Sequence, residues 1–114
     1  TLSTTTLCRR AVTEYRLRKP DDSQKIADLA ASFQFNLARG IAGLAVHAAR
    51  DRGIDRVVLS GGVAYNRAIR ETITDQVKSA GLELVINADL PLGDGCISFG
   101  QCMYAGMLTG SFGR

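Results

Sequence analysis

The sequence has few of the residues from which function is most easily read. Its 114 residues contain no tryptophan, one histidine, two prolines and three cysteines. Cys8, Cys96 and Cys102 form no CxxC pair, and none has a spacing to His47 that suits zinc. This excludes a zinc-ribbon domain and a disulfide-dense secreted scaffold. The odd, sparse cysteine count without a signal peptide favours the reducing cytoplasm.

Long hydrophobic runs and common catalytic motifs are also missing. No stretch reaches the ~18 uninterrupted apolar residues of a membrane-spanning helix, so we expect no membrane contact. There is no GxxxxGK[ST] phosphate loop and no GxSxG nucleophile elbow. His47 cannot be placed beside a cysteine as a nucleophile–base pair. The sequence therefore assigns no catalytic residue.

Charge is modest and uneven, with 14 basic and 11 acidic side chains and a net charge of +3. Five basic residues gather near the N-terminus, namely Arg9, Arg10, Arg16, Arg18 and Lys19. Such a cluster either meets a phosphate-rich partner or is a solvated helix face. Because only Tyr15 is aromatic there and no nucleic-acid motif is present, nucleic-acid binding is not the favoured interpretation.

Hydrophobic periodicity predicts an α/β arrangement. We expect helices over 7–18, from Asp22 or Ser23 for about twenty-five residues, over 66–80 and over 97–108, with strands over 54–60 and 82–86. The first strand is predicted to be buried, and the two strands to be parallel because a helix connects them. A two-stranded unit is marginal alone. The chain, which begins with Thr, is therefore expected to be part of a larger domain or to complete itself by dimerising.

The first candidate site is the turn from Ser60 to Asn66, directly after the first strand. Ligands in open α/β sheets lie beyond the carboxyl ends of strands. The glycine pair Gly61–Gly62 allows close backbone approach, and free N–H groups there attract phosphate. The alternative is a plain strand-to-helix turn. Asn66 either caps the following helix or contacts the ribose or base of a ligand.

The second candidate site is the loop around Asp94, between Gly93 and Gly95 and just before the last helix. A carboxylate at this place either caps the helix or supplies a hard oxygen ligand to Mg²⁺ or Fe²⁺. Cys96 is either a reactive thiol at the helix N-terminus or, as we favour, a small buried hydrophobe. The last helix is apolar on nearly every side, which predicts that it is buried or covered by another chain.

Together the two segments resemble the HypF family of hydrogenase maturation carbamoyltransferases. Residues 57–66 read VVLSGGVAYN, where that family has a pattern like LSGGVFQN. Residues 90–101 read LPLGDGCISFGQ, where it has P-x-x-D-G-G-I-S-x-G-Q. The resemblance covers about residues 24–108, and it is strong from 57 to 106 and weak before 20.

The resemblance implies a partial actin-like ATPase, or ribonuclease H-like, fold. It implies an enzyme that uses carbamoyl phosphate and ATP to form a carbamoyl-adenylate. The carbamoyl group then passes to the C-terminal cysteine of HypE and becomes a cyanide ligand of [NiFe] hydrogenase. Carried over by position, the nucleotide would be lined by Ser60, Gly61, Gly62, Asn66 and Gly95. Asp94 would bind a divalent metal, Mg or Fe.

The sequence departs from the family at Gln34, where many relatives have His, at Gly93 instead of Asn, and at Cys96 instead of the second glycine. The family's histidine metal ligands lie upstream of this sequence. We therefore expect a fragment or split subunit that is inactive without the remainder of the enzyme. The expected divisions are an unassigned segment 1–22, a C-terminal lobe of the carbamoyltransferase domain over 23–109, and a tail 110–114.

Two other functions compete with this interpretation. A tRNA threonylcarbamoyl-adenosine enzyme of the same fold would use the basic N-terminal half as a tRNA contact. A non-catalytic interaction module would bind a partner, or a second copy of the chain, through the apolar last helix.

Overall fold

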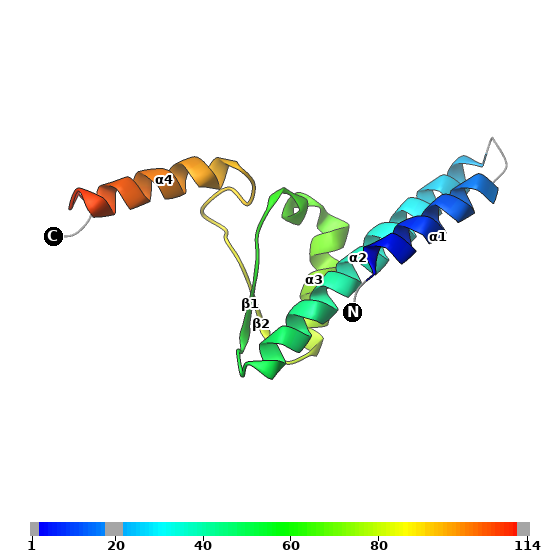
Figure 1. Cartoon of the computed structure of the whole chain (residues 1–114), viewed down its shortest axis with the longest axis horizontal. Coiled ribbons are helices and arrows are strands. Elements are labelled where there is room, and N and C mark those ends of the chain that lie inside the picture. Colours follow the sequence, from blue (N-terminus) through cyan, green and yellow to red (C-terminus); the bar gives the residue numbers. More distant parts are fainter. Residues whose placement is uncertain (1–2, 18–21, 112–114) are drawn as a thin grey trace.

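The computed structural model describes residues 3–17 and 22–111. Its elements are α1 (Thr4–Leu17), α2 (Ser23–Asp51), β1 (Arg56–Leu59), a 3-10 helix (Gly62–Tyr65), α3 (Arg67–Ser79), β2 (Glu83–Ile86) and α4 (Gly95–Leu108). The four predicted helices and two predicted strands are confirmed, and the 3-10 helix is an addition. The molecule is elongated, 65 × 32 × 22 Å, with the α1–α2 hairpin at one end and α4 at the other (Figure 1).

Some expectations fall outside the described residues. These are Pro20 as the end of the first helix, Arg18 and Lys19 of the basic cluster, and residues 112–114 of the expected tail.

Local signals explain both ends of α2, the longest helix. The carboxylate of Asp22 accepts a hydrogen bond from the Lys25 N–H at 3.0 Å, which is an N-cap. At the other end Gly53 has φ +64°, a left-handed conformation that glycine adopts without a steric penalty. Both predicted boundaries of this helix are confirmed.

The core lies between α2, α3 and one face of the sheet. The predicted inward stripe of α3, made by Ile69, Ile73 and Val77, is buried against Ala38 and Ala42 of α2. Both alanines are completely buried, and their small side chains let the two helices approach closely. This packing fixes β1, α3 and β2 as one unit, from which the loops at the strand ends extend.

The two strands pair in parallel, as predicted, from Arg56 opposite Glu83 to Leu59 opposite Ile86. The expectation that the first strand is buried is wrong in one respect. Its residues alternate between half-buried and exposed, and Val58 is 71% exposed. The reason is that α2 and α3 cover one face of the sheet, and none of the described residues forms a layer over the other face.

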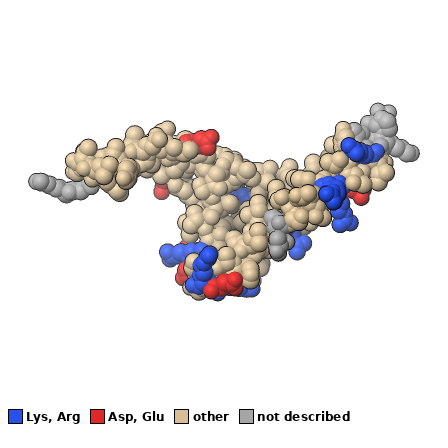
Figure 2. All heavy atoms as spheres, in the orientation of Figure 1, with Lys and Arg blue, Asp and Glu red and all other residues tan. Residues whose placement is uncertain are grey.

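The last helix, α4, is left largely exposed by the part of the chain that the structure describes. Of its residues only Gly106 is buried, whereas Ile97, Tyr104, Met107 and Leu108 are all more than half exposed. Figure 2 shows α4 without charged side chains, apart from acidic groups where it joins the rest of the molecule. The expectation that α4 is buried within the chain is therefore wrong. That another chain or segment covers α4 remains a prediction.

By length and composition alone, α2 is a helix that could cross a membrane. Core helices of soluble proteins meet the same criterion, and α2 packs against α1 and α3. The criterion is therefore weak evidence for a membrane role.

Candidate functional site

Two loops meet at the carboxyl ends of the parallel strands. The carbonyl oxygen of Leu92 accepts a hydrogen bond from the Gly61 N–H at 2.6 Å and another from the Ser60 hydroxyl at 3.4 Å. The Leu92 N–H donates to the hydroxyl of Tyr65 at 2.9 Å. The two segments singled out in the sequence, 33 residues apart at Gly61 and Asp94, thus form one continuous surface.

Glycine is required at position 61 by the backbone. Gly61 has φ +99° and ψ 159°, a region that is essentially restricted to glycine. Both Gly61 and Gly62 are exposed. Apart from the atoms of each glycine and its two neighbours in sequence, no atom lies within 4 Å of the place that a Cβ would take. This leaves open space above the glycine pair, which fits close approach of a ligand to the backbone.

One part of the phosphate expectation is wrong. The Gly61 N–H is not free, because it donates to Leu92. The predicted start of the following helix at residue 66 is confirmed, because Asn66 caps α3, and a 3-10 helix from Gly62 to Tyr65 separates that cap from the turn. An anion at this turn would therefore meet Gly62 and the loop, and not an open N-terminus of α3.

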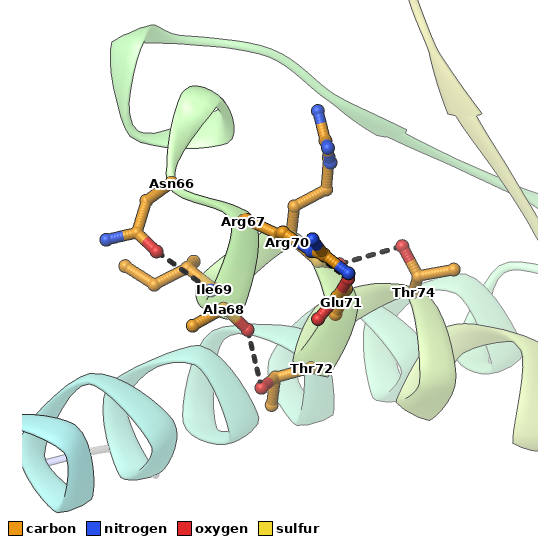
Figure 3. Close-up of polar contacts among 8 residues, drawn as sticks. All are labelled: Asn66, Arg67, Ala68, Ile69, Arg70, Glu71, Thr72 and Thr74. Carbon is orange, nitrogen blue, oxygen red and sulfur yellow. Dashed lines mark hydrogen bonds and ion pairs between the residues drawn. The ribbon is translucent and has the colours of Figure 1, made fainter.

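Asn66 is an N-cap, the first of its two predicted roles. Its Oδ1 accepts from the Ile69 N–H at 3.2 Å (Figure 3), and its Nδ2 donates to Oε1 of Gln34 on α2 at 3.2 Å. The side chain is exposed, and its second amide N–H is not used by the bond to Gln34, so a ligand could still bind it. Gln34, which marked a departure from the family pattern, is thus the partner of a predicted site residue.

Replacing Asn66 with aspartate and with alanine tests its role as a helix cap. A carboxylate retains the cap to Ile69, so the free energy of unfolding should stay within about 0.5 kcal/mol of the parent. Asn66→Ala removes the cap and should cost about 1 kcal/mol. Urea unfolding followed by circular dichroism measures both, and equal losses in the two variants would contradict the cap.

Arg67, the residue after Asn66, forms an ordinary ion pair within α3. Nε of Arg67 donates to Oε1 of Glu71 at 2.7 Å, and this contact raises the pKa of the Arg67 guanidinium above its ordinary value (Figure 3). The pair is exposed and spaced i, i+4, a geometry that contributes little to stability.

Asp94 neither caps α4 through its side chain nor completes a metal site. Its backbone is in the right-handed helical region, whereas a capping side chain requires an extended residue, and its carboxylate makes no capping hydrogen bond. Among residues 3–17 and 22–111, no three His, Cys, Asp or Glu side chains lie together as metal ligands would. The described residues therefore do not fit a metal centre by themselves, and the exposed Asp94 could supply one ligand at most.

A side chain on either glycine beside Asp94 would be in van der Waals contact with neighbouring residues. A Cβ on Gly93 would be 3.6 Å from Cε2 of Tyr65 and 3.7 Å from Cα of Gly62, and one on Gly95 would be 3.4 Å from Pro91. Cys96 is half-buried, and its thiol forms no disulfide with Cys8 or Cys102.

Sequence reasoning missed Leu92 and Tyr65, which join the two loops. Leu92 is 7% exposed, and a large aliphatic residue between Pro91 and Gly93 was the available signal. Beside the junction lies an open pocket of about 620 Å³, lined by Tyr65, Arg70 and residues 86–92. The described basic residues of α1 do not line it.

Comparison of the sequence with known proteins identifies the family of this chain. The sequence model of the family described as carbamoyltransferase, Kae1-like domain, second subdomain, matches residues 2–101. A probable carbamoyltransferase HypF of Methanocaldococcus jannaschii is 35% identical over 81 residues, covering 71% of this chain and 10% of that protein. A tRNA N6-adenosine threonylcarbamoyltransferase of Picosynechococcus sp. is 39% identical over 59 residues, covering 52% of this chain and 17% of that protein.

A solved structure agrees with the sequence matches. The crystal structure of T. kodakarensis HypF superposes with a TM-score of 0.70 and 33% identity over 93% of this chain, which is 13% of that one. The chain thus spans a small part of the length of its relatives, and it has the architecture of part of a carbamoyltransferase domain. The resemblance found in the sequence is confirmed: this chain belongs to the HypF-type carbamoyltransferase family and matches the second subdomain of its Kae1-like domain.

Proposed function

We propose that this chain is the nucleotide-binding portion of an ATP-dependent carbamoyltransferase with an actin-like ATPase fold. The observation that carries the proposal is the junction of the two loops, in which Leu92 joins the turn after β1 to the loop after β2. It brings the exposed Gly61–Gly62 pair and Asp94 to one edge of the sheet. Ligands of open α/β sheets bind at this edge.

The proposed nucleotide contacts follow from this arrangement. Gly62 and Gly95 would present backbone to the phosphates, where a side chain would block approach. Ser60 and Gly61 would support that surface through their bonds to Leu92. Asn66 would reach the ribose or base, next to Gln34. Asp94 would contribute one oxygen to a Mg or Fe site whose other ligands lie outside this chain.

The proposed reaction is that implied by the HypF resemblance. Carbamoyl phosphate and ATP would give a carbamoyl-adenylate, and the carbamoyl group would pass to the C-terminal cysteine of HypE in the cytoplasm. Within the described residues, the loops would position the phosphates against backbone N–H groups, and Asp94 would hold one side of a metal whose charge neutralises them. The chain alone would be inactive, and the remainder of the enzyme would complete the cleft and cover α4.

Calorimetric titration with ATP and Mg²⁺ tests the proposal. Saturable binding is expected, and Asp94→Ala should weaken it about tenfold through loss of a charged contact. Asp75→Ala, the same change on the exposed side of α3, is the matched control and should leave the affinity unchanged. Absence of binding heat up to millimolar ATP, or equal weakening in both variants, would contradict the proposed site.

A second candidate is tRNA modification by an enzyme of the same fold. The observation that favours it is the 39% identity to a tRNA N6-adenosine threonylcarbamoyltransferase. Arg9, Arg10 and Arg16 on α1 are exposed and would be its phosphate contacts. A tRNA gel-shift at several salt concentrations separates the candidates, because tRNA binding through these residues weakens steeply as salt rises.

A further inference from the structure

We propose that the hydroxyl of Tyr65 is a positioning group that holds the loop around Asp94 against the glycine turn. The structural half of this inference stands on the described contacts alone. Its consequence for ligand affinity rests on the proposed nucleotide site.

Hydrogen bonds of the Leu92 backbone hold the loop after β2 against the turn after β1. The Leu92 carbonyl oxygen is held by the Gly61 N–H, and the Leu92 N–H is held by the Tyr65 hydroxyl at 2.9 Å. Leu92 is 7% exposed, so loss of the hydroxyl would remove the hydrogen-bond partner from the N–H of a largely buried residue. The phenol hydroxyl is therefore the group that satisfies this donor.

The position of Tyr65 suits the role. It is the last residue of the 3-10 helix, directly after the buried Ala64, which anchors that turn in the body of the molecule. The ring edge faces Gly93, since a Cβ there would lie 3.6 Å from Cε2 of Tyr65. Gly93 is the residue before Asp94, so the ring and the hydroxyl together set how far Asp94 lies from the glycine turn.

Loss of the hydroxyl alone should loosen the loop without unfolding it. The bond from the Gly61 N–H to Leu92 would remain, and the ring would keep its place beside Gly93. The expected change is therefore local motion of residues 92–95, which alters ligand affinity more than global stability.

Amide hydrogen exchange followed by NMR tests the structural half. In Tyr65→Phe the exchange rate of the Leu92 amide should rise about tenfold, as expected for loss of one hydrogen bond, while far-UV circular dichroism stays unchanged. Tyr104→Phe makes the same chemical change on the exposed helix α4 and should leave the Leu92 amide unaffected. An unchanged Leu92 rate in Tyr65→Phe overturns the inference.

Titration with ATP and Mg²⁺ tests the functional half. We expect Tyr65→Phe to bind several-fold more weakly than the parent, with Tyr104→Phe equal to it. Equal affinity of Tyr65→Phe and the parent, despite faster Leu92 exchange, overturns the positioning role. If the parent binds no nucleotide, the proposed function fails, while the exchange measurement still decides whether the hydroxyl holds the loop.

Discussion

Replacing Gly61 with alanine is expected to separate the two loops and to abolish measurable nucleotide binding. With φ +99° and ψ 159°, Gly61 occupies a region that costs a residue with a side chain about 1–3 kcal/mol. Relief of that strain requires the peptide to turn, which breaks the 2.6 Å bond from the Gly61 N–H to Leu92. Calorimetry with ATP and Mg²⁺, beside urea unfolding, measures both effects.

Gly53→Ala is the matched control for this change. Gly53 also has a positive φ, +64°, but it lies at the end of α2, beyond the opposite end of β1 from the loops. The Gly53→Ala variant should lose about 1 kcal/mol of its free energy of unfolding and keep its affinity for ATP and Mg²⁺. If Gly61→Ala binds nucleotide like Gly53→Ala, the glycine turn is not part of the site.

Ile73→Ala is expected to cause the largest loss of stability, about 2–5 kcal/mol. Ile73 is 4% exposed at the centre of the stripe by which α3 packs on Ala38 and Ala42, and truncation leaves a cavity there. Since small domains are stable by only about 5–15 kcal/mol, much of the chain should then unfold at modest urea concentrations.

Ile97→Ala provides the comparison. It makes the same change on α4, where Ile97 is 60% exposed, and should alter the free energy of unfolding by less than about 0.5 kcal/mol. Urea titration of the parent and both variants measures this difference. Equal losses at Ile73 and Ile97 would contradict the packing of α3 on α2.

The sequence predicted those elements whose signals are local or periodic. The spacing of Ile69, Ile73 and Val77 identified the buried side of α3, and Asp22 and Gly53 marked the ends of α2. A helix between two strands indicated parallel pairing, which follows from chain geometry.

Features that depend on distant parts of the chain could not be predicted in this way. The apolar run around Val58 suggested burial on both faces. Whether a second layer covers the sheet is decided by segments outside the strand itself. Asp94 had the residue type of a cap, and the observed helical backbone removed that role. The bond from Leu92 to Tyr65 joins residues 27 apart and leaves no periodic signal.

The uncovered surfaces agree with the size of the chain. Val58 on the open face of the sheet and the apolar side chains of α4 are both exposed. The segments of this chain that match the relatives described above cover 10–17% of the length of those relatives. We expect the remaining length of such an enzyme to cover these surfaces, as apolar patches of this kind mark interfaces.

The most direct test of the site is an NMR map of the amide shifts that ATP and Mg²⁺ cause in this chain. The proposed site predicts the largest shifts at Gly61, Gly62 and residues 93–95, with little change along α1. Shifts confined to α1 and α2, or no saturable shift at either loop, would contradict the assignment of the joined loops as the nucleotide site.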